Sequence, residues 1–361
     1  MTRPLESAYM QWAKLSSAAR YNFATSGIVS VTRDEFPLDP RELEINAPGA
    51  YGYEPLLQRI AQHTGAPENS VVTAAGTSMA NHLAMAAVLE PGDEVLIESP
   101  AYGLLVEVAR YLGARVSRFS RHVDNDFAID LAEIADAITD RTRLIVISNL
   151  HNPSGALVTR ETLAALAGVA RRVGANVLVD EVYLEMLFGR EEPAAFLIDP
   201  ETFIITNSLT KTYGLSGLRC GWILARPQLA KRMRLLNDFF DVNAPHLAER
   251  ASVIAFDRLA QFRDRACRLL EKNRALLDAF LDRRSDLDVF RPPAGTVVFP
   301  GLKSGRTAEF VRLLREEYET SVVPGEFFEM PDQFRIGIGG ATDDVRAGLE
   351  RITAALDRIA P

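Results

Sequence analysis

The chain has 361 residues, and its 40 Lys plus Arg against 48 Asp plus Glu leave a formal net charge of −8. This length corresponds to about two domains of roughly 150 residues, and 47% hydrophobic with 24% charged residues excludes a disordered or fibrous chain. A chain with this negative net charge lacks the positive field that would attract nucleic acid or an anionic membrane, so neither is an expected partner.

The N-terminal residues come first in chain order and carry no targeting pattern. Residues 1–17 lack the sustained apolar stretch of a signal peptide, and no apolar run approaches the roughly 18 residues of a membrane span. The two cysteines, Cys220 and Cys267, stand in no disulfide or metal-ligand spacing. We therefore expect a cytoplasmic protein with no metal site and no membrane partner.

From about residue 70 to residue 225, short β-branched runs alternate with longer stretches of helical apolar spacing. This alternation is the signature of βαβ units, and it predicts an α/β fold with a mainly parallel, seven-stranded sheet flanked by helices. The expected strands are 71–73, 94–98, 115–119, 144–148, 176–179, 203–206 and 221–224. The expected helices are 78–89, 101–112, 131–138 and 160–173.

The pattern changes after about residue 245. The elements expected there are one long helix at 247–281, short strands at 297–299, 321–323 and 335–338, and a last helix at 343–359. The first 34 residues are too few to fold alone, so we expect them to pack with this part. The predicted division is a large domain over residues 35–244 and a smaller α+β domain from residues 1–34 and 245–361.

Polar side chains follow five of the predicted strands at the point where each strand ends. In an open parallel sheet, ligands bind beyond the carboxyl ends of the strands, so these side chains should gather at one edge. They include a glycine-opened helix start, an aromatic ring, an amide, a carboxylate, a hydroxyl and a lysine. The five segments are Ala75-Gly76-Thr77-Ser78, Ser99-Pro100-Ala101-Tyr102, Asn149 to Gly155, Asp180-Glu181-Val182-Tyr183 and Asn207-Ser208-Leu209-Thr210-Lys211.

Each segment taken singly has an ordinary structural explanation, as a turn, a helix cap or a surface residue. Three other classes of α/β enzyme lose support. No G-x-G-x-x-G follows the first strand, Thr210-Lys211-Thr212 lacks the glycines of a P-loop, and Gly214-Leu215-Ser216-Gly217 misses the spacing of a nucleophile elbow. The combination of segments is therefore more informative than any single motif.

That combination resembles the class I/II aminotransferases, the fold-type I enzymes that depend on pyridoxal 5′-phosphate (PLP). The resemblance covers nearly the whole chain and keeps the family's order. It implies a PLP-dependent aminotransferase that moves an amino group between an α-amino acid and a 2-oxo acid with ping-pong kinetics. The similar segments are Tyr51-Gly52-Tyr53, Gly76-Thr77-Ser78, Asn152 to Gly155, Asp180 to Tyr183, Ser208 to Lys211, Gly217 to Trp222 and Phe334-Arg335-Ile336.

The resemblance assigns the cofactor chemistry to residues at the sheet edge. It implies that Lys211 forms the Schiff base and later moves the α-proton, and that Asp180 pairs with the pyridinium nitrogen. Tyr183 and Asn152 are expected to hydrogen-bond the phenolic oxygen of the ring. Tyr102 stands where the family stacks an aromatic ring on the cofactor.

The resemblance also implies a phosphate site and a substrate site. The residues expected at the phosphate are Gly76, Thr77, Ser78, Ser208 and Arg219. Tyr51 is expected to reach the phosphate across the interface of a homodimer with shared active sites, with Tyr53 as the alternative. The residues expected at the substrate carboxylate are Gly27, Asn152 and Arg335, because an arginine can bind a carboxylate through two parallel bonds.

The residues leave the outcome of the reaction open. A C–S β-lyase, a racemase or a PLP-dependent cyclase would keep Asp180, Lys211 and Arg219 and differ only in other pocket residues. A non-catalytic effector-binding domain of a transcription regulator is a further alternative. That class requires a basic winged-helix domain before the PLP domain, where this sequence has only about 34 residues without a basic cluster. Transamination is the first expectation because it needs only these residues.

Overall fold

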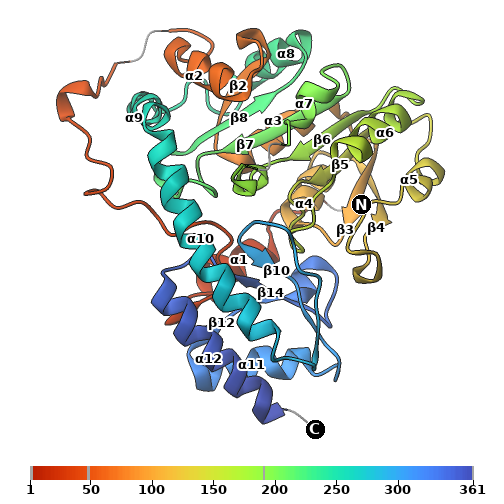
Figure 1. Ribbon diagram of the computed structural model, residues 1–361. Coiled ribbons are helices and arrows are strands. Elements are labelled where there is room, and N and C mark those ends of the chain that lie inside the picture. The colour runs from red at the N-terminus through yellow and green to blue at the C-terminus, as the bar shows by residue number, and fades with distance from the viewer. Residues whose placement is uncertain (1–2, 47–48, 190–191, 360–361) are drawn as a thin grey trace.

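The structure is a computed structural model that describes residues 3–46, 49–189 and 192–359. Its centre is a seven-stranded sheet in the order β2-β8-β7-β6-β5-β3-β4 (Figure 1). The pairings are parallel except those of β8, which runs antiparallel to β2 and to β7. The predicted fold class and its mainly parallel sheet are confirmed. The strands are β2 Val71–Ala75, β3 Glu94–Ser99, β4 Arg115–Ser120, β5 Thr142–Ser148, β6 Asn176–Asp180, β7 Phe203–Ser208 and β8 Cys220–Leu224.

Both faces of this sheet are buried. Successive residues of a strand point to opposite faces, and in β3 the side chains of Val95 and Ile97 join one hydrophobic cluster while Leu96 joins another. This two-sided burial explains the continuous apolar runs of central strands such as β5 and β7, whereas the edge strand β4 alternates between exposed and less exposed residues. One face is covered by α3 Thr77–Val88, α4 Gly103–Tyr111 and α8 Pro227–Asn237. The other face is covered by α2 Glu54–Thr64, α5 Leu131–Ala137, α6 Arg160–Arg171, α7 Ala195–Ile198 and α9 His246–Asp257.

The single long helix predicted at 247–281 is wrong, because the chain forms two helices there. α9 ends at Asp257 and α10 spans Leu259–Leu281; between them Arg258 has φ −115° and ψ 13°, outside the helical region. Phe256 of α9 packs in a cluster of the large sheet, whereas most of the buried residues of α10 pack in a different core. Helical apolar spacing continues across the break, so the pattern did not reveal it.

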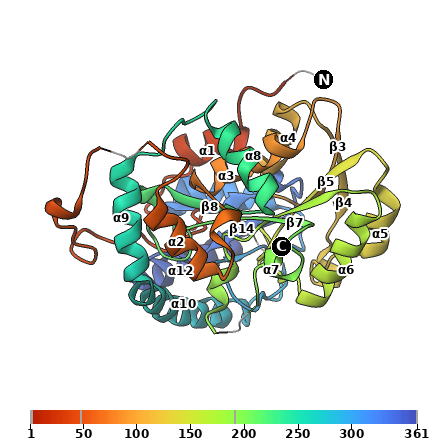
Figure 2. The same cartoon turned by 90° about the horizontal axis from the view of Figure 1, so that it is seen from above.

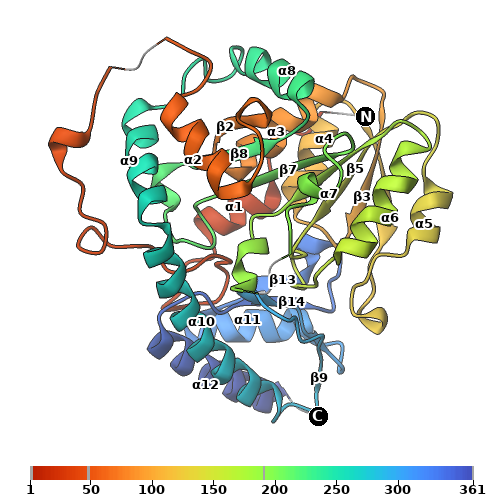
Figure 3. The same ribbon diagram turned by 45° about the horizontal axis from the view of Figure 1, so that its top comes forward.

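The second core lies under α10, α11 (Thr307–Tyr318) and α12 (Thr342–Ile359), seen below the large sheet in Figures 1 and 3. The strands here are short, and they form small sheets beside the helices. They are β1 Tyr21–Asn22 with β12 Thr320–Ser321, β9 Leu287–Asp288 with β11 Gly301–Leu302, and β10 Val297–Val298 with β14 Phe334–Gly337 and β13 Val323–Pro324.

The N-terminal segment packs with this second core, since β1 pairs in parallel with β12 and Phe23 lies in the same cluster. It begins with α1 (Ala8–Leu15). The division of the chain into domains at residues 34 and 244 stays a prediction. The helix α9, which begins just after residue 244, packs on α2 and β8 of the large sheet region. Seen from above, α9 and α5 lie at opposite ends of the large sheet (Figure 2). Among the described residues, no helix has the length and apolar composition to cross a membrane, and no three or more His, Cys, Asp or Glu are grouped to ligate a metal.

Candidate active site

A cleft of about 970 Å³ opens beyond the carboxyl ends of the strands, between the large sheet and the N-terminal segment. Most of the predicted site residues line it, which is what the parallel arrangement of the strands requires. Gly76 and Arg335 lie directly behind it, against Arg219 and Asn152 respectively. The predicted residues in its wall are Gly27, Thr77, Ser78, Tyr102, Asn152, Asp180, Tyr183, Ser208, Lys211 and Arg219.

Asp180 is the last residue of β6 and is 6% exposed. Its Oδ2 accepts a hydrogen bond from Asn81 Nδ2 (2.8 Å), and its Oδ1 accepts one from the backbone N–H of Val182 (3.2 Å). Asn81 is held in turn by Thr206, whose hydroxyl donates to Asn81 Oδ1 (2.6 Å). Burial raises the pKa of Asp180 to about 6, although these two hydrogen bonds and the charge of Lys211 act to lower it. A cation bound in the cleft beside this carboxyl would lower its pKa and keep it ionised.

Lys211 follows the end of β7 and reaches across the cleft to the N-terminal segment. Its Nζ donates to Ser26 Oγ (3.1 Å), and the hydroxyl of Tyr183 donates to the same oxygen (2.7 Å). Burial lowers the pKa of Lys211 and raises that of Tyr183 to about 12. A larger fraction of the lysine is therefore the uncharged amine, which is the form that acts as nucleophile and base.

The start of α3 and Arg219 form a cradle for an anion. Gly76 has φ 82°, and a Cβ on it would lie 3.0 Å from Arg219 Cζ, so only glycine fits. The amides of Thr77 and Ser78 belong to the first turn of α3, where N–H groups lack helical partners. Thr77 Oγ1 is buried and, within the described part of the chain, has no hydrogen-bond partner. Arg219 donates from Nη2 to the carbonyl of Ala75 (2.9 Å). These donors fit a phosphate group such as that of PLP.

At the opposite wall, Arg335 of β14 is fully buried. Its Nη1 donates to Asn152 Oδ1 (2.8 Å), and its Nη2 donates to the carbonyl of Ala24 (2.9 Å) and to the hydroxyl of Tyr9 (3.3 Å). None of these acceptors is charged, and Nε has no partner among the residues that the structure describes. A buried guanidinium without a counter-charge is costly. A bound carboxylate would supply that charge.

The cleft residues that motif reading missed include Tyr9, Ser26 and Asn81. Asn81 carries a usable signal, because it is a polar residue on the apolar, sheet-facing side of α3, one helical turn after Thr77. Ser26 precedes a predicted site residue but belongs to no motif. Tyr9 has no signal at all, since its partner Arg335 is 326 positions away in the sequence.

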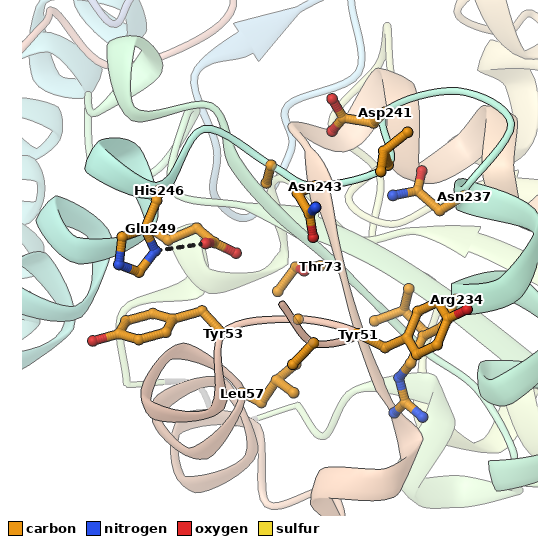
Figure 4. Close-up of a pocket in the computed structure, with 15 residues that line it drawn as sticks. Tyr51, Tyr53, Leu57, Thr73, Arg234, Asn237, Asp241, Asn243, His246 and Glu249 are labelled. Carbon is orange, nitrogen blue, oxygen red and sulfur yellow. Dashed lines mark hydrogen bonds and ion pairs between the residues drawn. The ribbon is translucent and has the colours of Figure 1, made fainter. Parts of the chain in front are cut away.

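Tyr51 does not line the cleft of its own chain. It lies in a separate pocket, where Figure 4 shows it beside Arg234, and its hydroxyl donates to Asp238 Oδ2 (3.0 Å). Tyr53 turns the other way, with its ring edge-on to His246 at 4.7 Å between ring centres. The side chain of Tyr51 is 54% exposed, so it is accessible to a second chain.

Comparison with known proteins places these residues in a family context. The sequence matches the family described as "Aminotransferase class I and II" over residues 44–352. Capreomycidine synthase of Streptomyces vinaceus is 29% identical over 350 residues, which cover 94% of this chain and 90% of that protein. Aspartate aminotransferase of Sulfurisphaera tokodaii is 26% identical over 330 residues, 86% of this chain and 82% of that protein.

The chain is also similar to solved structures of PLP-dependent enzymes. A PLP-dependent aminotransferase from Streptococcus suis is 27% identical, with a TM-score of 0.92 over 100% of both chains. A PLP-dependent cyclase is 24% identical, with a TM-score of 0.89 over 100% of this chain and 99% of that one, a similarity that shows the fold alone. The family match spans most of the chain, and the cradle, the lysine and the acid fit PLP. The chain belongs to the class I and II aminotransferases, and it is a PLP-dependent aminotransferase of fold type I.

Proposed function

We propose that Lys211 carries PLP as an imine and that the chain transfers amino groups between α-amino acids and 2-oxo acids in ping-pong order. The observation that carries this proposal is the arrangement of the cleft. A single cleft brings together a buried lysine with a lowered pKa, a buried carboxyl at Asp180, and an anion cradle at Gly76 and Arg219. The guanidinium of Arg335 lies behind the opposite wall of the same cleft, bonded to Asn152.

When bound, PLP supplies an electron sink for the carbanion left by the departing α-proton. The chain's own residues perform the remaining tasks. Asp180, oriented by Asn81, would keep the ring nitrogen of the bound cofactor protonated by its opposite charge. The amine of Lys211 would take the α-proton of the substrate as a general base and would then give that proton up as a general acid. Tyr183, whose raised pKa keeps it a phenol, remains a hydrogen-bond donor throughout.

The substrate end of the cleft selects a carboxylate. Arg335 and Asn152 are already hydrogen-bonded to each other, so both are held in place before a substrate arrives. At Gly27 a Cβ would lie 3.2 Å from Lys211 Cδ, so glycine keeps the space beside the lysine open. Because amino acids and 2-oxo acids both carry an α-carboxylate, one clamp serves both halves of the cycle.

The test follows the cofactor rather than the product. With an accepted amino acid and no oxo acid, we expect the imine absorbance to fall stoichiometrically to that of pyridoxamine phosphate, and a 2-oxo acid to restore it. Borohydride reduction of the resting enzyme, followed by peptide mapping, should label Lys211. A label on another lysine, or none after PLP loading, would remove the proposed mechanism.

Cyclisation is the second candidate, and two similarities favour it. The relative that covers 94% of this chain is named capreomycidine synthase, and a structural neighbour with a TM-score of 0.89 is a PLP-dependent cyclase. A cyclase, a C–S β-lyase or a racemase would return the imine form in every turnover. Persistence of the imine absorbance while a cyclised product, pyruvate or the opposite enantiomer accumulates would therefore replace transamination as the function.

We also propose that the chain acts as a homodimer with shared active sites. The region from the end of α8 to α9 exposes large apolar side chains, among them Phe239 at 83% and Val242 at 65%. Tyr51 joins this region through its bond to Asp238. A second copy covering this patch would bring Tyr51 toward a neighbouring cleft. A cytoplasmic location and the absence of nucleic-acid and membrane partners stay predictions.

A further inference from the structure

Ser26 lies where the N-terminal segment meets Lys211, and no motif marks it. Its side chain is buried, with 7% exposure, and its Oγ is 3.1 Å from Lys211 Nζ and 2.7 Å from the hydroxyl of Tyr183. A serine hydroxyl has two acceptor lone pairs. Both are used here, one by the amine and one by the phenol.

The backbone of Ser26 is held independently of its hydroxyl. Thr296 Oγ1 donates to the carbonyl of Ser26 (2.7 Å), and the N–H of Ile28 donates to the carbonyl of Lys211 (2.9 Å). Gly27 lies between these two anchors, with the space for a Cβ only 3.2 Å from Lys211 Cδ. Removing the hydroxyl therefore changes the surroundings of the lysine amine while these backbone contacts remain.

We propose that Ser26 is a further catalytic residue, whose hydroxyl holds the amine of Lys211 while that amine is not bonded to the cofactor and stabilises it once it has gained a proton. In that step the Cα–H bond of the substrate breaks, an N–H bond forms on Lys211, and the electron pair stays with the substrate. An ammonium has three donors and no acceptor. In a buried site these donors need acceptors, and Ser26 Oγ accepts one of them.

Two further features support this role. Burial lowers the pKa of Lys211, so its charged form is costly without a nearby acceptor. Tyr183 donates to the same oxygen and so fixes where the lone pairs of Ser26 point. The inference rests on the proposed role of Lys211 as the lysine that moves the proton.

The test compares Ser26→Ala with Ser16→Ala, which removes the same oxygen from an exposed serine at the end of α1. In the cofactor-free full chain, the pH dependence of Lys211 labelling by an amine reagent, read by mass spectrometry, gives the pKa of this lysine. We expect Ser26→Ala to shift it down by about one unit, because the ammonium loses a charge-assisted bond. In the PLP-loaded enzyme kcat should fall roughly tenfold or more with little change in KM. Ser16→Ala should change neither.

In Ser26→Ala, a Lys211 pKa within about 0.3 units of the wild-type value, together with a kcat within about twofold of wild type, would overturn the proposal. If Ser26→Ala does not fold, the pair Ser26→Thr and Ser26→Val answers the same question, since the two side chains share a shape and only threonine carries the hydroxyl. Labelling in the cofactor-free chain does not depend on PLP chemistry. A shifted pKa together with borohydride labelling of another lysine would thus keep the contact and reject the proposed function instead.

Discussion

The two walls of the cleft are built in different ways. One wall consists of residues at the ends of neighbouring strands, such as Asp180 and Lys211, each placed by the apolar run that precedes it. The other is assembled from Tyr9, Ala24 and Arg335, which are distant in the sequence and joined by hydrogen bonds to one guanidinium. The first wall carries groups suited to a cofactor and the second carries groups suited to a carboxylate.

This difference has a functional consequence. Changes in the strand-end wall should alter what the bound cofactor does, whereas changes in the opposite wall should alter how firmly the substrate is held. Ser26 is a member of the second wall that contacts Lys211 of the first. The expected effects below run from the largest to the smallest.

Asp180→Asn tests the strand-end wall most directly. The neutral amide cannot keep the ring nitrogen protonated, so we expect kcat to fall by roughly 10² to 10⁴-fold. PLP binding should weaken by only about 1.5 to 3 kcal/mol, the scale of one charge-assisted hydrogen bond. Stopped-flow measurement of the half-reaction and a PLP titration give the two losses. A chemical step close to the wild-type rate would make Asp180 a purely structural acid.

Arg335→Ala tests the opposite wall. Loss of the buried guanidinium should raise KM for the amino acid and for the oxo acid together, corresponding to a loss of about 2 to 5 kcal/mol of binding free energy. The imine absorbance of the resting enzyme should be unchanged if Arg335 binds the substrate carboxylate and not the cofactor, as proposed. Arg335→Lys should recover only part of the loss, since a lysine cannot form the two parallel bonds. An effect on only one of the two substrates would separate their binding sites.

Glu181→Gln compares two neighbouring acids, since Asp180 ends β6 and lines the cleft whereas Glu181 follows it and lines a different pocket. Glu181 accepts a hydrogen bond from the N–H of Ala195 (2.7 Å), and burial raises its pKa to about 8. The folded state therefore binds this proton more tightly than the unfolded state, whose glutamate titrates near 4.3. Its contribution to stability is complete at low pH and is lost as the pH rises toward about 8.

Glutamine mimics the protonated acid, so the variant should lose this dependence and exceed wild type at pH 8 by about 1 kcal/mol or more. Urea unfolding of both cofactor-free proteins at pH 5 and at pH 8 measures the difference. Asp180 also has a raised pKa, but its contribution to the pH dependence of stability is the same in wild type and in Glu181→Gln, so it cancels in the difference. Transaminase activity should stay within about twofold, and parallel stability curves would contradict the assignment.

Tyr51→Phe is expected to have the smallest effect. Losing one phosphate contact from a neighbouring chain should weaken PLP binding by about 1 kcal/mol. Tyr53→Phe is the matched control, because the hydroxyl of Tyr53 already receives a hydrogen bond from Arg250 of its own chain (2.7 Å). If Tyr53→Phe weakens PLP binding instead, the contact belongs to Tyr53.

Mixed dimers extend this test. Subunits with Tyr51→Phe and subunits with Lys211→Ala should together regain a site in which both residues are intact. A PLP affinity at the Lys211-containing site of the hybrid that returns to the wild-type value supports sites shared between chains. A fully active monomer in sedimentation experiments would exclude the homodimer.

The sequence by itself determined the large sheet and most of the cofactor side of the cleft. Apolar runs revealed all seven strands, and the polar residues just after them, such as Asp180 and Lys211, line the predicted edge. Both signals are local, because a strand and the residue that ends it are neighbours in the chain. Parallel pairing then brings the strand ends together whatever the loops contain.

Only the tertiary structure decided the rest. The break at Arg258 depends on which of two cores receives each helix, and helical spacing does not encode that choice. Ser26 and Tyr9 enter the cleft because β1 pairs with β12 and draws the N-terminal segment over Lys211. Such partners are selected by packing and hydrogen bonding between residues far apart in the chain, so their positions become visible only when the whole chain is folded.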